Sequence, residues 1–398
     1  MPNGQFGTRL QGGDDSASER YIFTQLNPLT RYLYPETDDQ ILQYQNDDGT
    51  IVEPEFYVPI IPMALINGIS GIGTGFSCSI PPYNVENIVN YLKKMLQQES
   101  LKGFKFIPYY EGFKGTVQEI DSNKFLIKGV YEKVDDNNII IKELPVGTWT
   151  MPYITFLESV IDNKKQHEIR DFHNLSTEVN VHIQVTFHKG IIEKLESELD
   201  MNGTNGIAKL LKLTTSVSTT NMHLFDDNCK LHKYKDVQEI IEAHAISRLH
   251  NYNLRKKFLI EILEKKLVKM NNKARYIQAI LDDELDLRKK KSQEVHDILV
   301  NSGYNKVDDS FKYLIKMPMD SVTDENVKQI MEERDETTDE LEFIKKMSIQ
   351  KMWYSELELF EAEFKKFKAY REKLQSPDSS GKQPKMKKRI VRKKATSK

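Results

Sequence analysis

Arg20 and Tyr21 are neighbouring residues whose side chains could together carry out a chemical step. A tyrosine hydroxyl is a weak nucleophile at its ordinary pKa of about 10, and it needs a neighbouring cation or metal to act. An adjacent guanidinium can stabilise the charge that develops on a phosphate under attack. The chain contains 18 tyrosines, most of which must be structural, so this pair alone also fits a purely structural interpretation.

A glycine-rich stretch over residues 67–75 is a second candidate site. Its spacing differs from the G-x-G-x-x-G pattern of dinucleotide-binding loops, and the Lys-Ser/Thr pair of a P-loop is absent. The stretch could be a buried turn. It could also present Ile72 on a tight backbone, in the way that DNA-bending proteins insert an apolar side chain between base steps.

Metal ligands and disulfides are not predicted. The nine histidines show no H-E-x-x-H or H-x-x-x-H pattern, and the two cysteines, Cys78 and Cys229, lie far apart in the sequence. So few cysteines suit a reducing, intracellular compartment. No apolar stretch reaches the roughly 18 residues of a membrane helix, and the polar N-terminus does not resemble a signal peptide.

Length and composition predict a soluble protein of two or three domains, because the 398 residues are 39% hydrophobic and 29% charged. The net charge of −2 is unevenly distributed: residues 376–398 carry +8, which leaves −10 for the remainder. An acidic body gives no reason to expect DNA binding from composition, so a DNA-binding surface would have to be local. The tail is expected to be disordered and basic, and to serve as a nuclear localisation signal, as a weak DNA contact or for no specific purpose.

Both helices and strands are predicted among the elements that would position these residues. A short helix is predicted over residues 19–33, with Ser16 or Ser18 as its N-cap, and a hairpin over residues 41–55 that turns at Asp48-Gly49. An amphipathic pattern predicts a helix over residues 85–97. Alternating and apolar runs further predict strands over 115–120, 125–133, 139–144 and 179–187, and short helices over 153–162, 191–199 and 206–213.

The last part of the chain is predicted to be a long helical arm. Apolar residues in 4-3 spacing, from Leu263 to Leu281 and again from Leu357 to Leu374, predict two antiparallel helices in a coiled coil. The first is expected to run from about residue 236 to 301, roughly 90–100 Å. The small helical tip between them is expected to offer apolar residues to a second copy, unless they form its own core: Val295, Ile298, Leu299, Tyr304, Phe311, Tyr313 and Leu314.

Several segments, in order along the chain, are distinctive as a set. They are PNGQFGTRL at residues 2–10, SASERYIFT at 16–24, VEPEFYVPIIPM at 52–63, GIGTG at 71–75, FKGT at 113–116, ELPVGTWT at 143–150 and MHLFD at 222–226. Together they resemble the breakage–rejoining region of eukaryotic-type type IIA DNA topoisomerases (DNA topoisomerase II). The resemblance extends to about residue 375. It implies an α+β, mainly α fold: the end of a winged-helix domain over residues 1–34, an α/β tower domain over 35–220, a coiled-coil exit gate over 221–375 and the basic tail over 376–398.

By this resemblance, Tyr21 is the nucleophile that forms a 5′-phosphotyrosyl bond with DNA, and Arg20 stabilises the transition state. Ile72 matches the family's DNA-bending isoleucine. Hydroxyl and amino groups of the implied DNA contacts would bind phosphate and carry no sequence information; these contacts are Arg9, Lys212, Thr214, Thr215, Ser216, Ser218, Thr219, Thr220 and Asn221. Asp14 and Glu19 stand where relatives commonly carry Lys and Pro, so we expect altered DNA or inhibitor contacts near the scissile phosphate.

The resemblance also implies cofactors and partners. A homodimer joined at its coiled-coil tips would cut double-stranded DNA, pass a second duplex through the gap and reseal the break. The complete enzyme would use Mg²⁺ and ATP, bound by TOPRIM and ATPase domains that precede this region in the family. This chain alone is therefore expected to bind neither cofactor, to be inactive, and to need a separate or upstream chain that carries those domains.

No membrane association is expected; the location would be the nucleus in a eukaryote, or the host cell or virus factory for a virus. The alternative function is a non-enzymatic DNA-bending or dimerisation module from a truncated or split gene. A plain coiled-coil scaffold would leave Arg20-Tyr21 and the glycine-rich stretch unexplained.

Overall fold

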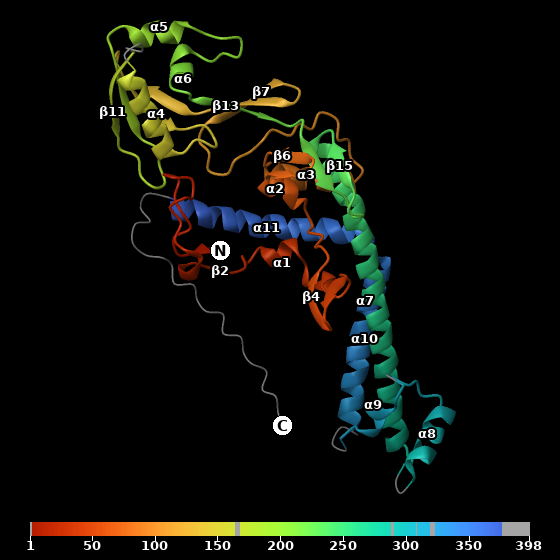
Figure 1. Ribbon diagram of the computed structural model, residues 1–398. Helices are drawn as coiled ribbons and strands as arrows, with labels where there is room; N and C mark the ends of the chain where they lie inside the picture. The colour runs from red at the N-terminus through yellow and green to blue at the C-terminus, as the bar shows by residue number, and fades with distance from the viewer. Residues whose placement is uncertain (1, 164–167, 288–289, 308, 319–322, 376–398) are drawn as a thin grey trace.

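The computed structural model describes residues 2–163, 168–287, 290–307, 309–318 and 323–375, so the basic tail predicted over 376–398 lies outside the described residues. Helices and sheets are both present, as expected, and a long helical arm projects from a more compact part that holds the strands (Figure 1). Within the described ranges, no helix is long and apolar enough to cross a membrane.

One hydrophobic core lies beneath a four-stranded antiparallel sheet of order β11-β12-β10-β9. Its strands are β9 (Val130–Lys133), β10 (Asn138–Glu143), β11 (Ile169–Asn174) and β12 (Ile183–Phe187), and α4 (Thr150–Asp162), α5 (Ile191–Ser197) and α6 (Gly206–Leu210) complete this unit. Every second residue of β10 and β12 is buried, because side chains alternate between the faces of a sheet. A three-stranded sheet of order β13-β8-β7 adjoins it, made of β7 (Thr116–Asp121), β8 (Lys124–Lys128) and β13 (Thr214–Ser218).

The single strand predicted over residues 125–133 is wrong, because the chain divides there into β8 and β9, which belong to different sheets. The break falls at Gly129. A side chain at this position would collide with the backbone carbonyl of Glu143, so a residue without a Cβ is required where the two sheets meet.

The helix predicted over residues 19–33 is also wrong. A 3-10 turn (Glu19–Tyr21) leads into β2 (Phe23–Thr24), which pairs with β1 (Pro2–Asn3), and only α1 (Thr30–Leu33) is α-helical. Pro28 interrupts the stretch, and the Asn27 side chain accepts the Leu29 N–H at 2.9 Å just before α1. The predicted hairpin is confirmed as β3 (Tyr44–Asp47) and β4 (Thr50–Pro54), with positive φ at Asp48 and Gly49.

A second core joins the middle of the chain to the base of the arm. Its elements are α2 (Met63–Asn67), β5 (Ile69–Gly73), β6 (Phe76–Ile80), α3 (Val85–Leu96), β14 (Met222–Phe225), β15 (Leu231–Tyr234) and parts of α7 and α11. The prediction of α3 is confirmed, and its N-cap Asn84 accepts the Asn87 N–H at 3.2 Å. This core takes residues from both sides of residue 221, where the tower and exit-gate segments were expected to divide.

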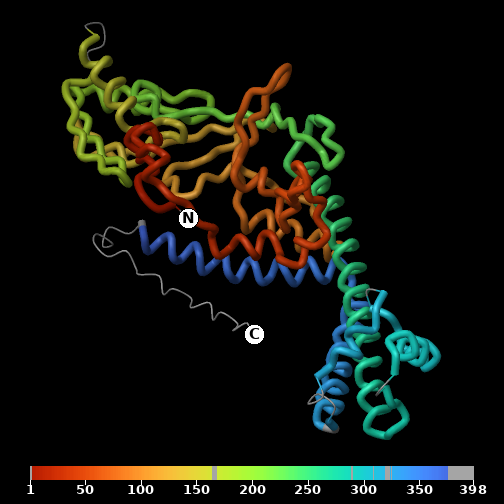
Figure 2. Tube along the Cα trace, turned by 60° about the horizontal axis from the view of Figure 1, so that its bottom comes forward, coloured from red at the N-terminus to blue at the C-terminus, as the bar shows by residue number. Residues whose placement is uncertain are grey.

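The arm consists of α7 (Val237–Leu281) and α10 (Asp324–Lys346), which lie side by side (Figures 1 and 2). The first helix ends twenty residues earlier than predicted, because the chain turns at Asp283, whose φ is +56°. At 45 residues α7 is about 68 Å long. Residues 292–301 form a separate helix, α8 (Ser292–Asn301).

The second apolar repeat does not continue the coiled coil. Helix α10 ends at Lys346, and after Met347-Ser348 the chain continues as α11 (Ile349–Gln375). This helix leaves the arm and runs across the molecule beside α1 and α3 (Figure 1). Its Leu357 and Phe360 are buried in the second core. The spacing correctly indicated an apolar helix face, but α11 packs against α3 and the base of α7 rather than along the arm.

A third, small core lies at the tip of the arm, around α8 and α9 (Lys312–Ile315). The expectation that the tip leaves its apolar residues incompletely buried is wrong for five of the seven, which are buried in this core: Val295, Leu299, Tyr304, Phe311 and Leu314. The remaining two are partly buried, and the Tyr313 hydroxyl donates to the Asn305 carbonyl at 2.7 Å. Val300 and Ile315, by contrast, are exposed apolar residues of this region.

Candidate functional site

Tyr21 lies at the end of a loop that closes on itself. The β1–β2 pair joins the two ends of residues 2–24, and the Thr8 N–H and hydroxyl both donate to Asp15, at 2.8 and 2.5 Å. These bonds lower the pKa of Asp15 and keep its carboxylate charged. The Tyr21 side chain is 68% exposed, so its hydroxyl is accessible to a large substrate.

Arg20 precedes it in the same 3-10 turn and is exposed. Among the described residues its guanidinium has no ion-pair or hydrogen-bond partner, so it is free to bind an anion. Asp14 and Glu19 are exposed as well. An accessible phenol beside an unpaired guanidinium is an arrangement that can attack and stabilise a phosphate.

Arg9 is engaged within the protein. Its guanidinium forms an ion pair through both terminal nitrogens with Glu143, a carboxylate that is completely buried at the end of β10. A buried carboxylate requires such a partner, because an unpaired charge in the interior is strongly destabilising. Of the implied DNA contacts, Arg9 is therefore the one whose charge is already neutralised by the fold.

Ile72 lies near the tip of the β5–β6 hairpin and is 94% exposed. The turn depends on Gly75, whose φ is +83°. Gly73 gives room for the ring of Phe76, which would lie 2.8 Å from a Cβ there and which stacks edge-on against Phe225 with centroids 6.0 Å apart. The hairpin thus holds an apolar side chain in solvent on a supported backbone, which a buried turn would not do.

The segment over residues 212–221 contains β13, an edge strand, followed by a connection to β14. Ser216, Ser218 and Thr220 are exposed, whereas Thr214 and Thr215 are partly buried. The Ser218 and Thr220 hydroxyls are 3.0 Å apart. The exposed hydroxyls lie along one edge of the sheet and are available to phosphate oxygens.

Three other members of this segment have structural contacts. The Lys212 ammonium lies 4.3 Å from the ring centroid of Phe156, and Thr219 is buried, with its N–H donating to the Asn123 carbonyl at 3.0 Å. The Asn221 amide donates to the Ser77 hydroxyl at 2.7 Å, and the Ser79 N–H donates to the Asn221 carbonyl at 2.8 Å. Asn221 therefore fastens this segment to the hairpin that carries Ile72.

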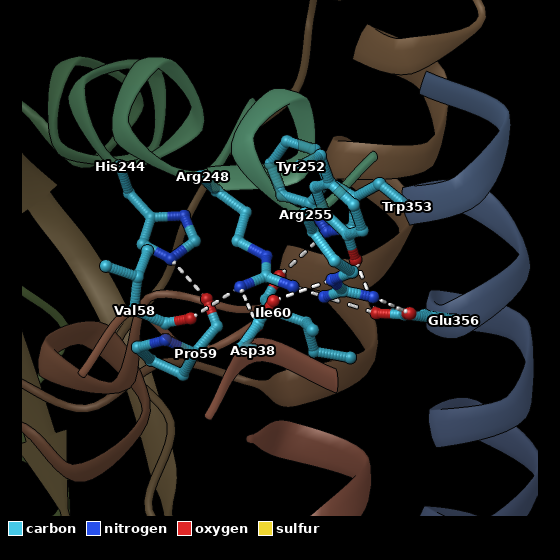
Figure 3. A network of polar contacts seen from close by, with 10 residues as sticks. All are labelled: Asp38, Val58, Pro59, Ile60, His244, Arg248, Tyr252, Arg255, Trp353 and Glu356. Atoms are coloured by element: carbon cyan, nitrogen blue, oxygen red, sulfur yellow. Dashed lines mark hydrogen bonds and ion pairs between the residues drawn. The ribbon is translucent and has the colours of Figure 1, made fainter. Parts of the chain in front are cut away.

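A buried ionic cluster, formed by Asp38, Arg248, Arg255 and Glu356, was missed in the sequence (Figure 3). Asp38 accepts from Arg248 Nη1 and Arg255 Nε, both at 2.6 Å, and Glu356 on α11 pairs with both arginines of α7. Burial alone would lower the pKa of Arg255, but Glu356 and Asp38 raise it. These residues lie up to 318 positions apart in the sequence, so no local spacing signals the cluster.

Aromatic residues enclose the cluster. The Tyr252 ring lies close to both guanidinium groups, with its centroid 4.2 Å from that of Arg248 and 4.5 Å from that of Arg255. Trp353 is completely buried beside it and donates to the Ile60 carbonyl at 2.9 Å (Figure 3). The cluster therefore joins the segment over residues 38–60 to the bases of α7 and α11.

The described residues contain no group of three or more His, Cys, Asp or Glu side chains that could hold a metal ion. Cys78 is buried and Cys229 is exposed, and both are free thiols.

Comparison with known proteins gives a consistent result. The A-subunit family model of DNA gyrase/topoisomerase IV matches residues 1–358. The chain is 35% identical to DNA topoisomerase 2-beta of Gallus gallus, over 93% of this chain and 24% of the relative, and 33% identical to DNA topoisomerase 2 of Plasmodium falciparum, over 90% and 28%. The chain thus spans about a quarter of the length of these relatives.

A solved structure is similar over most of the fold. The crystal structure of the Plasmodium falciparum topoisomerase II DNA-binding, cleavage and re-ligation domain superimposes with a TM-score of 0.81 and 34% identity. The match covers 94% of this chain and 53% of that chain.

Proposed function

This chain belongs to the A-subunit family of DNA gyrase/topoisomerase IV, among the type IIA topoisomerases, and on that premise we propose that it forms the breakage–rejoining region of a type II DNA topoisomerase. The observation that carries the proposal is the exposed Tyr21 hydroxyl beside the unpaired guanidinium of Arg20, on a loop closed by its own hydrogen bonds.

The reaction is a reversible transfer of a phosphodiester bond. The Tyr21 oxygen attacks a backbone phosphorus, the bond from phosphorus to the 3′ oxygen breaks, and the 3′ oxygen takes up a proton as the phenol loses one. Arg20 stabilises the charge on the phosphate oxygens during the transfer. One phosphate ester replaces another, so the reverse attack by the 3′-hydroxyl reseals the strand without an external energy source.

DNA would be held by two surfaces in addition to the nucleophile. The exposed hydroxyls of β13 and its connection bind phosphates. Ile72 inserts between base steps and bends the duplex, which is supported by its almost complete exposure at the hairpin. Asn221 connects these two surfaces, so we expect binding and bending to be coupled.

Two copies would act on the two strands of one duplex, as a homodimer in contact at the tips of the arms. The exposed Val300 and Ile315 supply apolar surface for that contact. We further propose that the complete enzyme uses Mg²⁺ and ATP, held in TOPRIM and ATPase regions supplied with this one, and that it acts in the nucleus of a eukaryotic cell or where viral DNA is handled.

The test is formation of a covalent protein–DNA adduct. The purified chain is mixed with a polypeptide that carries the TOPRIM region, Mg²⁺ and labelled duplex DNA, and the reaction is stopped with denaturant. We expect an adduct with wild-type protein and none with Tyr21→Phe, while DNA binding stays within about twofold. Tyr57→Phe is the control, because Tyr57 is similarly exposed at 55% but lies on another segment.

An adduct that persists in Tyr21→Phe would remove Tyr21 as the nucleophile. If wild-type protein bends DNA but never forms an adduct, the non-enzymatic function replaces the enzymatic one.

A further inference from the structure

Three contacts fasten the loop that carries Tyr21 to the sheet and helix around β10 and α4. Arg9 pairs with Glu143, the Met151 N–H donates to the Leu10 carbonyl at 2.9 Å, and Gly12 lies against the indole of Trp149. We refer to these contacts together as the loop anchor. All three fall on one stretch of the loop, residues 9–12, about ten residues before Tyr21.

Glu143 is the fixed point of the anchor. Its carboxylate accepts the Leu144 N–H at 3.0 Å and the Lys114 N–H at 3.2 Å, in addition to both terminal nitrogens of Arg9. Two of these four donors are backbone N–H groups, next to β7 and β10, so the position of this fully buried carboxylate is set by the backbone at the ends of those strands. A guanidinium fork on a carboxylate is directional, so the loop is held in orientation as well as in place.

Gly12 contributes by its shape. Its φ is +67°, and a Cβ at this position would penetrate the Trp149 ring. The loop backbone therefore rests directly on the indole. The adjacent Gly13 also has a positive φ, +96°, but a Cβ there would meet nothing within 4 Å. Both positions require a positive φ, but only Gly12 also requires the absence of a Cβ, because of its contact with Trp149.

The anchor links the nucleophile to the DNA-contacting strand through α4. Met151 is in the first turn of α4, and Phe156 on the same helix supports the ammonium of Lys212, which lies two residues before β13. Tyr21 and the hydroxyls of β13 are therefore held relative to one helix. Within the loop, the Thr8–Asp15 bonds transmit this placement toward Tyr21.

We propose that Glu143 and Trp149, with Arg9 and Gly12 as their partners, are positioning residues for the cleavage reaction: they hold the Tyr21 loop in register with the DNA bound along β13. This inference rests on the proposed function and assigns Arg9 to an ion pair within the protein rather than to DNA. A misplacement of about 1 Å at a reacting group can lower a rate by roughly 100-fold, so loss of the anchor is expected to act on rate rather than on affinity.

The first experiment uses the glycine pair. Gly12→Ala and Gly13→Ala are compared by hydrogen exchange of the free chain and by the cleavage rate at saturating DNA, with the TOPRIM-carrying polypeptide present. We expect Gly12→Ala to raise amide exchange across residues 2–24 and to slow cleavage by roughly 10- to 100-fold. Gly13→Ala also places a side chain at a positive φ, one less favourable than that of Gly12, but its Cβ meets no neighbouring atom, so it is expected to stay within about threefold of wild type in both measurements.

The second experiment tests the ion pair. Arg9→Leu and Glu143→Gln should each slow cleavage by roughly 10- to 100-fold without changing the dissociation constant for DNA more than about twofold, and their combination should be no worse than either alone. Arg9→Lys keeps the charge opposite Glu143 and should recover part of the rate. If Arg9 instead contacted DNA, Arg9→Leu would weaken DNA binding. It would also reduce the slope of the logarithm of the binding constant against the logarithm of the salt concentration by about the amount expected for one phosphate contact.

The outcomes separate the two proposals. Unchanged exchange in Gly12→Ala and Arg9→Leu would show that the anchor does not hold the loop, whatever the enzyme does. Raised exchange with a wild-type cleavage rate would show that the anchor does not position Tyr21. If wild-type protein forms no adduct, the proposed function fails; the positioning role is then overturned with it, and the exchange data decide only whether the anchor holds the loop.

Discussion

Replacing Asp38 with asparagine is expected to destabilise the junction between the arm and the rest of the molecule. In the buried ionic cluster, two arginines are balanced by two carboxylates, and Asp38 contacts both guanidinium groups at 2.6 Å. Asparagine has nearly the same shape but no charge. The change therefore leaves one positive charge uncompensated where Arg248 and Arg255 are almost completely buried.

The expected loss is about 3–5 kcal/mol, the usual effect of removing one partner from a buried ion pair. That is a large part of the roughly 5–15 kcal/mol that separates a folded domain from its unfolded state. The matched control is Asp39→Asn, one residue further on. Asp39 pairs with Arg31 at 2.9 Å, but the two side chains are 30% and 58% exposed, so the control should cost below about 1 kcal/mol.

Trp353 provides the assay, because it is completely buried beside the cluster whereas the other tryptophan, Trp149, is 41% exposed. Denaturant titration followed by tryptophan fluorescence should therefore report mainly on this junction. We expect Asp38→Asn to move the midpoint to clearly lower denaturant and Asp39→Asn to leave it nearly unchanged. Equal, small shifts for both variants would refute the reasoning that the cluster depends on a balance of buried charge.

Further predictions concern bending, pH and the tip. Ile72→Ala should reduce the DNA bend seen by energy transfer between labelled duplex ends, with stability changed by no more than about 0.5 kcal/mol; equal loss from Ile51→Ala, which is also exposed, would contradict a specific wedge. Burial lowers the pKa of His244 from 6.5 to about 4, with Arg248 adding to the effect although the hydrogen bond with the Pro59 carbonyl opposes it. The unfolded chain then binds the proton first, and the free energy of unfolding should fall by about 2 kcal/mol from pH 7 to pH 5; an equal fall in His244→Gln would assign this pH dependence to other groups. Leu314→Asp should unfold the tip, whereas Ile315→Asp should keep its circular dichroism and shift sedimentation toward monomer; a dimer that survives Ile315→Asp would place the contact elsewhere.

Local patterns predicted much of this fold. Asp48-Gly49 specified a turn, and apolar spacing located α3 and the apolar faces of α7 and α11, because each signal lies within one element. The partner of each face was not predictable from spacing. The repeat that includes Leu357 has coiled-coil periodicity, yet it packs on α3, and β13 lacks the apolar alternation that would identify a strand.

For the candidate site, the identity of Tyr21 and Ile72 came from motif resemblance, and their exposure was not visible in the sequence. Glu143 also stands in a motif, but its role depends on Arg9, 134 residues earlier, and on backbone donors that only the fold brings together. The same holds for Asp38 and Arg248, 210 residues apart. Long-range pairing of charges was therefore the part that the sequence could not provide.

The continuity of α7 gives the arm a mechanical property. One uninterrupted helix leaves the ionic cluster at Arg255 and ends at Leu281, about 39 Å away. A rigid rod of that length behaves as a lever, so tilting its base by about 5° displaces its end by about 3 Å. In a two-armed assembly the two displacements add. A small change of tilt around Asp38 and Glu356 would thus become a movement of several ångströms at the tips.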